Sequence, residues 1–190
     1  MILTLDRRQM TARWLQLTRL EPLRADCVVT RTYGIDLEAL AASEARLWYV
    51  SLLGRGPLRW LRVAEMADDA TLESADDGSV TVILPKNCVR PVSVELHGWE
   101  RPAPVVAADS PEAWLQTNPF SRGGVARPVA VMQPGGRLQI FSPPAPGQAR
   151  LKSLRGVADP GEDTFIFDEE ALTTVPVLDG RAPLAFDFPE

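Results

Sequence analysis

The chain has 190 residues, of which 45% are hydrophobic and 24% are charged, as in an ordinary folded globular protein. Its net charge of −5 argues against broad nonspecific binding to nucleic acid or to anionic lipid. No stretch approaches 18 apolar residues, and the first residues contain no apolar run long enough for a secretory signal, so we expect no membrane partner and a cytoplasmic protein.

The N-terminal third is predicted to be helical. Only Pro22 and Pro57 precede Pro85, so 15 of the 17 prolines lie from Pro85 onward, where they disfavour long helices. The first helix is expected between an Asp6 cap, with Gln9 placed as in a capping box, and Pro22. Its apolar face comprises Met10, Trp14 and Leu17. The second helix is expected from the Asp36 cap to the stop signals Gly54 and Pro57, with a buried stripe of Leu37, Ala41, Ala45, Trp48 and Leu52.

The remainder is predicted to be rich in strands. A strand or short helix is expected over 58–66, a hairpin over 71–84 around Asp77-Gly78, and a strand over 89–96 with Val92, Val94 and Leu96 inward. Pro91 should mark the start or an edge of that strand. A short helix over 110–118, with Ser110 as cap and Pro111 at the first position, precedes a hairpin that turns at 134–136. Residues 149–157 and 163–168 are further strand candidates.

These elements predict an α+β fold in which N-terminal helices pack on a mostly antiparallel, curled β-sheet. We expect a single domain over 1–190, with a helical part at 1–66 and a β-rich part at 67–190.

Residues suited to catalysis are few. His97 is the only histidine, and although Glu95 lies on the same face of its strand, a polar strand face gives the same pattern; we assign no catalytic residue. Cys27 and Cys88 lack metal-site spacing and are expected to be buried thiols, and the acidic segment 68–77 lacks the spacing of a calcium loop. No phosphate-binding or nucleophile motif occurs, so no metal and no cofactor are expected.

Surfaces for partner proteins are the remaining candidates. Trp and Arg are the residue types that contribute most to interface energy. In the Pro-rich segment that follows His97, Trp99 is either a core residue or an interface residue beside Arg101. Phe120 and Arg122 lie in a second Gly-containing segment. Arg122 and Arg127 flank the glycines there, but two arginines near one aromatic residue are weak evidence for nucleic-acid binding by an acidic protein.

The C-terminal tail offers one more candidate surface. Leu184, Phe186 and Phe188 alternate along the tail, which would have to dock on its own domain or on a neighbouring subunit by strand addition.

The segments "LPKNCVRPVSVELHGWERPAPVV" and "DSPEAWLQTNPFSRGGVARPVAVM" resemble virion-associated proteins of phages and prophages from Bacteroidetes-type hosts. The resemblance covers about residues 84–131, a quarter of the chain. The matching positions are Leu84, Pro85, Arg90, Val92, Ser93, Leu96, Trp99, Arg101, Pro102, Ser110, Pro111, Gln116, Asn118, Arg122, Gly123, Pro128 and Val129. Asn87-Cys88 replaces an Asp-Phe pair of that pattern, and a Pro-containing tail replaces an expected C-terminal helix.

The resemblance implies a structural protein of the neck or head–tail connector kind, found in the cytoplasm before assembly and then in the virion. Its partners would be further copies of itself and other virion proteins. Two hypotheses compete with this one: a bacterial protein- or peptide-binding module, and an enzyme with an unfamiliar site at Glu95, His97 and Glu100.

Overall fold

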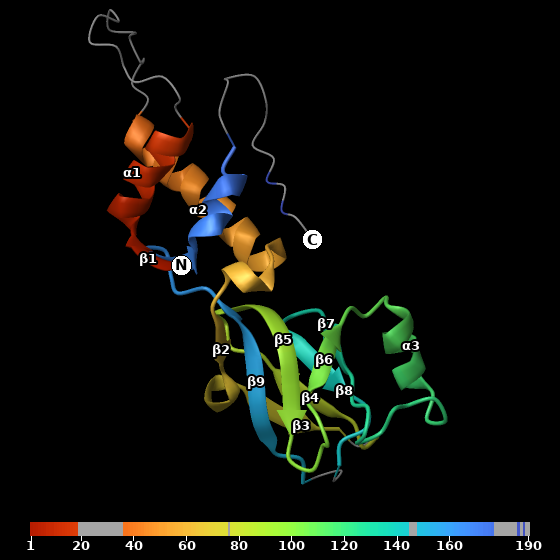
Figure 1. Cartoon of the computed structure of the whole chain (residues 1–190). Coiled ribbons are helices and arrows are strands. Elements are labelled where there is room, and N and C mark those ends of the chain that lie inside the picture. Colours follow the sequence, from red (N-terminus) through yellow and green to blue (C-terminus); the bar gives the residue numbers. More distant parts are fainter. Residues whose placement is uncertain (19–35, 76, 145–147, 177–185, 187, 189–190) are drawn as a thin grey trace, which may run out of the picture. The chain divides into compact units, whose positions relative to one another are not determined.

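The structure is a computed structural model that describes residues 1–18, 36–75, 77–144, 148–176, 186 and 188. It confirms an α+β fold with a curled sheet (Figure 1). The chain forms two compact units: residues 1–62 with 159–190, and residues 63–158. The expected division at residue 66 does not anticipate this arrangement, because the C-terminal segment belongs with the N-terminal helices rather than with the larger sheet.

The first unit joins the two ends of the chain. Strand β1 (Ile2–Asp6) pairs antiparallel with β10 (Thr164–Asp168), and helices α1 (Arg7–Thr18) and α2 (Leu37–Arg55) pack together. Two 3-10 helices, η1 (Leu58–Trp60) and η3 (Glu169–Thr174), complete the unit. Strand β1 and its pairing with β10 were not expected from the sequence.

Both predicted helix starts are confirmed. The amide of Gln9 donates to Asp6 Oδ1 at 2.8 Å, and the amide of Asp6 donates to Gln9 Oε1 at 3.0 Å, which is a reciprocal capping box. Asp36 Oδ1 accepts from the amides of Glu38 and Ala39 at 3.0 and 3.1 Å. Helix α2 ends at Arg55, between the two predicted stop signals Gly54 and Pro57.

Aromatic side chains form the core of the first unit. Trp48 packs edge-to-face on Phe167, with ring centroids 5.3 Å apart, and contacts Trp14 at 5.9 Å. Tyr49 contacts Phe165 at 5.0 Å. The core therefore joins α1 and α2 to β10, which lies more than 100 residues away in the chain.

The second unit is an eight-stranded sheet in the order β2-β9-β5-β6-β7-β8-β4-β3. Its elements are β2 (Val63–Glu65), η2 (Ala67–Asp69), β3 (Thr71–Ser74), β4 (Val80–Ile83), β5 (Cys88–Leu96), β6 (Ala103–Val106), α3 (Pro111–Thr117), β7 (Ala130–Gln133), β8 (Arg137–Ile140) and β9 (Leu151–Ala158). All neighbouring strands pair antiparallel except β6 and β7, which are parallel.

The sheet curls because its two edge strands are neighbours in sequence. Only residues 66–70 separate β2 from β3, and five residues span at most about 20 Å. The edges must therefore lie near each other, and the enclosed face is filled with apolar side chains. These are Met66, Val80, Val82, Leu84, Val94, Leu96, Trp99, Ala103, Ala130, Leu138, Ile140 and Leu154.

The hairpins, the short helix and the two late strands occur where the sequence predicts them. Pro91 is different, because it lies inside β5 opposite Gly156 rather than at the strand's start. A register shift between Pro91 and Ser93 accommodates it, since a bulge tolerates the missing amide proton of proline.

Glu65 fastens the β2 edge of the sheet to β9. Its carboxylate accepts from the Leu154 amide at 2.6 Å, from Ser153 Oγ at 2.5 Å and from the amides of Met66 and Ala67 at 3.2 Å. Desolvation alone would raise the pKa of this carboxyl, but the four hydrogen bonds favour its charged form, so its pKa lies below the ordinary value.

Candidate functional site

Four large apolar side chains are exposed on the connection between β6 and β7. Trp114 is 71% exposed, Leu115 53%, Phe120 98% and Val125 39%. We call these four residues the crossover surface, because their segment carries the chain from β6 through α3 to the parallel strand β7. Figure 1 shows α3 outside the sheet, beside β6 and β8.

The short helix turns its larger apolar residues outward. Ser110 Oγ accepts from the Ala113 amide at 3.2 Å and caps α3, and Pro111 occupies its first turn. Ala113 and Gln116, three residues apart, are buried against the unit. Successive helical residues are about 100° apart, so Trp114 and Leu115 face solvent.

Phe120 is held in a turn although its ring contacts almost nothing. Its amide donates to Asn118 Oδ1 at 3.0 Å, and the Ser121 amide donates to the Asn118 carbonyl at 3.1 Å. Ser121 Oγ also donates to the Leu115 carbonyl at 2.7 Å. These bonds tie the turn to the end of α3, so the exposed ring projects from an ordered backbone.

Arg122 joins the crossover to the sheet. Its Nε donates to the Gln116 carbonyl at 2.6 Å, and one guanidinium NH₂ group donates to the carbonyl of Phe141, just after β8, at 3.0 Å. The guanidinium lies 5.3 Å from the centre of the Phe141 ring. The sequence suggested Arg122 as an interaction residue. In the structure its side chain instead supports the backbone that carries the crossover surface.

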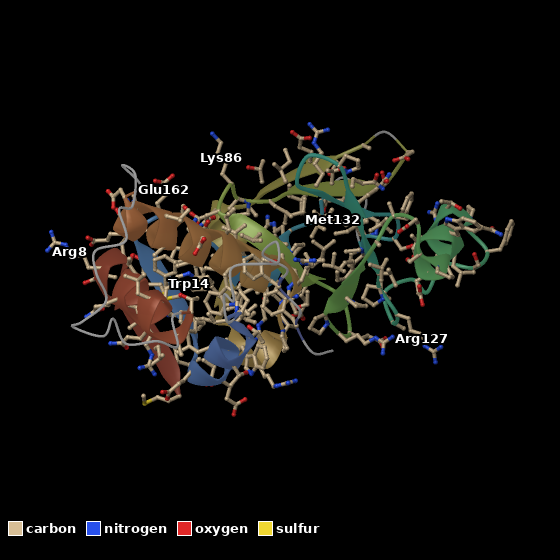
Figure 2. The ribbon with its side chains drawn as sticks, turned by 90° about the horizontal axis from the view of Figure 1, so that it is seen from above. Arg8, Trp14, Lys86, Arg127, Met132 and Glu162 are labelled. Carbon is tan, nitrogen blue, oxygen red and sulfur yellow. The ribbon has the colours of Figure 1, made fainter. Side chains whose placement is uncertain are left out.

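Gly123 allows the chain to return close to itself. A Cβ at this position would lie 2.2 Å from the Arg127 carbonyl oxygen, nearer than any side chain permits. The Arg127 amide meanwhile donates to the Gly123 carbonyl at 3.1 Å. The Arg127 side chain is exposed and points outward (Figure 2).

The other suggested interaction residues are not among the four that form the crossover surface. Trp99 is buried in the core of the sheet, and its indole nitrogen donates to the Ser142 carbonyl at 3.3 Å, so it takes the core position that was the alternative. Arg101 is exposed, and Phe186 and Phe188 are half-buried. Leu184 and Cys27 lie outside the described residues, whereas Cys88 is half-buried and burial raises the pKa of its thiol.

The residues of the hypothetical carboxylate–histidine site face solvent or other partners. His97 and Glu100 are exposed, and Glu95 forms a 2.6 Å ion pair with Lys152. Two cavities lined by described residues of the first unit do not include any of these three side chains.

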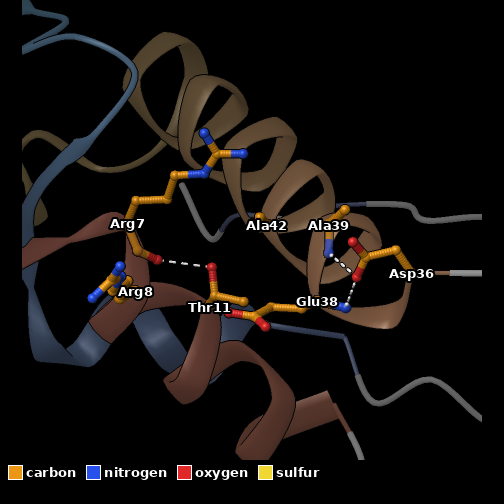
Figure 3. A pocket seen from close by; sticks show the side chains of 7 residues that line it. All are labelled: Arg7, Arg8, Thr11, Asp36, Glu38, Ala39 and Ala42. Carbon is orange, nitrogen blue, oxygen red and sulfur yellow. Dashed lines mark hydrogen bonds between the residues drawn. The ribbon is translucent and has the colours of Figure 1, made fainter.

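Both cavities belong to the first unit. One, of about 290 Å³, lies between the starts of α1 and α2 and is lined by side chains of both charge signs (Figure 3): Arg7, Arg8, Thr11, Asp36, Glu38, Ala39 and Ala42. Two of its polar groups stabilise the helices themselves: Thr11 Oγ1 donates to the Arg7 carbonyl at 2.7 Å, and Asp36 caps α2. The second, of about 250 Å³, adjoins it through Arg7 and Ala42.

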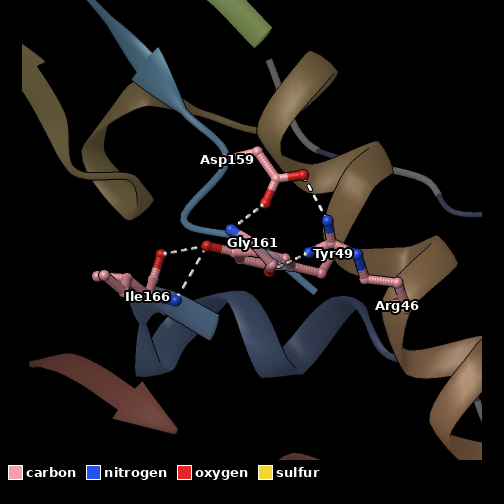
Figure 4. Close-up of polar contacts among 5 residues, drawn as sticks. All are labelled: Arg46, Tyr49, Asp159, Gly161 and Ile166. Carbon is pink, nitrogen blue, oxygen red and sulfur yellow. Dashed lines mark hydrogen bonds and ion pairs between the residues drawn. The ribbon is translucent and has the colours of Figure 1, made fainter. Parts of the chain in front are cut away.

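A polar network next to the second cavity holds the segment before β10 on α2 (Figure 4). Arg46 forms an ion pair with Asp159 and donates to the Gly161 carbonyl at 3.1 Å. The Tyr49 hydroxyl donates to the Ile166 carbonyl at 3.2 Å and accepts from its amide at 3.0 Å. Burial raises the pKa of Tyr49, so its hydroxyl stays protonated as a donor. The network is structural.

Within the described residues, no group of three or more His, Cys, Asp or Glu side chains is arranged to hold a metal ion. The helices of the same residues include none long and apolar enough to span a bilayer. A scan against protein-family models finds no match for this chain, and a search of curated proteins finds no significant similarity.

The crossover surface is the candidate site in the larger unit, because four exposed apolar side chains lie on one connection between strands. Sequence reasoning selected Phe120 but missed Trp114 and Leu115. The spacing of Ala113 and Gln116 after the Ser110 cap could have shown that these two residues face outward.

Proposed function

We propose that the protein is a non-enzymatic assembly subunit of the phage neck or head–tail connector kind, in which the crossover surface packs on a neighbouring copy of the chain. The contact is head-to-tail: the surface of one copy meets a different face of the next, and such contacts close into rings when the rotation between copies allows it.

The observation that carries this proposal is the ordered display of Phe120, 98% exposed on a hydrogen-bonded turn. Full burial of one such side chain releases about 1.5–3 kcal/mol. Because Asn118 and Arg122 already fix the backbone, little further ordering is needed on binding. Trp114 adds a second aromatic side chain of the type that dominates interface energy.

The phage resemblance supports the same segment. Several of its matching positions are those that set the crossover's geometry: Ser110, Pro111, Gln116, Asn118, Arg122 and Gly123. The exposed residues Trp114, Leu115 and Phe120 fall at positions that the pattern leaves open.

The proposal is tested by replacing Trp114 and Phe120 together with serine. Wild-type protein should form closed oligomers as its concentration rises, measured by light scattering behind size exclusion, and the double variant should lose them. Val89→Ser is the matched control, because Val89 is an exposed apolar residue on β5 of the same unit. Assembly of a folded double variant at wild-type concentration, with the fold checked by circular dichroism, would refute the proposal.

A further inference from the structure

The outward face of α2 carries a second exposed apolar stripe. Leu40 is 45% exposed, Leu47 60% and Val50 44%. Ser43 lies between Leu40 and Leu47 on this face, and Gly54 follows Val50. The positions 40, 43, 47, 50 and 54 are thus spaced alternately by three and four residues, as in the contact face of a helix that packs along another helix. A Cβ at Gly54 would meet nothing within 4 Å.

The opposite face of α2 is fully used inside the first unit. It buries Ala41, Ala45, Trp48, Tyr49, Leu52 and Leu53. The helix is thus apolar on two sides, a pattern typical of a helix that is covered on both. One side is covered by its own unit, and the other is exposed.

We propose that a second copy of this chain covers the exposed face, with the two α2 helices antiparallel about a two-fold axis near residues 48 and 49. This contact shares no residue with the crossover surface, so its experimental test does not depend on whether the proposed function is correct.

This register is self-complementary in shape. Leu47 of each copy lies opposite Val50 of the other, and the small residue Ser43 lies opposite Gly54, which lets the helices approach closely. Leu40 lies opposite position 57 in this register, just beyond the last residue of the partner's α2. Leu47 and Val50 thereby pack on apolar side chains, and Ser43 packs on a small residue.

Charge complementarity supports the antiparallel direction. Glu44 and Arg55 are 11 residues apart, about three full turns, so they lie on the same flank of the stripe. In the antiparallel pair, Glu44 of each copy lies beside Arg55 of the other. Opposite charges at these positions favour the antiparallel contact.

Glu44 and Arg55 keep atoms available for this contact. Glu44 is half-buried and uses Oε2 to accept from the Trp14 indole nitrogen at 3.1 Å. Arg55 is exposed and donates from one guanidinium NH₂ group to Ser51 Oγ at 2.5 Å.

The area of contact predicts a weak dimer. The 19-residue helix is about 28 Å long, and a strip about 10 Å wide on each copy buries roughly 600 Å² in all, a little over a third of the roughly 1,600 Å² of a standard stable interface. The dimer should therefore depend steeply on protein concentration.

Sedimentation equilibrium of the full chain tests the contact. To remove ring formation from the measurement, every sample carries Trp114→Ser and Phe120→Ser. Adding Leu47→Glu places carboxylates within the apolar seam and should weaken dimerisation by at least about a hundredfold. Gln16→Glu, an exposed change of the same charge on α1, is the control and should leave the dimer intact. A parent protein that remains monomeric at millimolar concentration, or equal dimerisation by the folded Leu47→Glu variant, would overturn the proposal.

Cross-linking tests the direction separately. With both native cysteines replaced by alanine, Ser43→Cys combined with Gly54→Cys should form disulfide-linked dimers, because these positions face each other. Ser43→Cys alone should not, since the two copies of residue 43 would be about 16 Å apart along the axis. Efficient dimers from Ser43→Cys alone would indicate parallel helices and overturn the proposed arrangement.

Discussion

Replacing Arg122 with alanine removes the side chain that joins the crossover to the sheet. It eliminates the hydrogen bonds to the Gln116 and Phe141 carbonyls and the contact with the Phe141 ring. Hydrogen bonds from a charged donor contribute about 1.5–3 kcal/mol each, and a partly exposed cation–π contact about 0.5–1 kcal/mol. Since Arg122 is only half-buried, we expect about 2–4 kcal/mol, felt mainly as local opening of residues 107–129.

Amide hydrogen exchange measures this opening directly. The Phe120 and Ser121 amides, both hydrogen-bonded in the turn, should exchange about thirtyfold to several hundredfold faster in Arg122→Ala, following the expected free energy. The matched control is Arg127→Ala, because that arginine's side chain is exposed and points outward. Equal protection in Arg122→Ala and wild type would show that Arg122 does not hold the crossover, and it would remove the main support for an ordered interaction surface.

Three further predictions concern single residues. Glu65→Gln should destabilise the protein at neutral pH. Because the folded pKa of Glu65 lies below its unfolded value, the difference in unfolding free energy between wild type and variant should shrink as pH falls through the folded pKa. Urea midpoints at about pH 7 and about pH 3 would show this. Gly123→Ala should cost about 1–3 kcal/mol because its Cβ meets the Arg127 carbonyl, whereas Gly54→Ala, with open space around its Cβ on a helix, should stabilise by about 1 kcal/mol; equal thermal shifts would contradict both. His97→Ala should change unfolding free energy by less than about 0.5 kcal/mol and leave assembly intact, because the side chain is exposed; loss of a measurable catalytic activity would contradict the structural account.

Local signals in the sequence predicted much of the fold. The caps at Asp6, Asp36 and Ser110 and the turn at Asp77-Gly78 each involve hydrogen bonds or dihedral angles within a few residues, so they can be inferred without knowing the fold. The turn at 134–136 belongs with them, since both of its glycines adopt positive φ.

Long-range pairing was not predictable in this way. The β1–β10 pair joins residues more than 150 positions apart, and the parallel β6–β7 pair depends on the crossover that separates them. Neither pairing leaves a local mark in the sequence, so the two-unit division was also missed.

The candidate surfaces were only partly visible for a related reason. Trp99 and Phe120 are both aromatic residues in Gly- and Pro-containing segments, yet one lies in the core and the other is almost fully exposed. The difference arises because Trp99 lies on the enclosed face of the curled sheet and Phe120 does not, and the formation of that face depends on long-range strand pairing. On α2, the sequence showed the buried stripe but gave no measure of which apolar residues would remain uncovered, such as Leu47.

Light scattering behind size exclusion, over a wide range of wild-type concentration and with negative-stain imaging of any large species, tests the central claim most directly. The account predicts closed rings of defined size that appear as concentration rises. A protein that remains a monomer or simple dimer at every concentration would contradict ring assembly through the crossover surface.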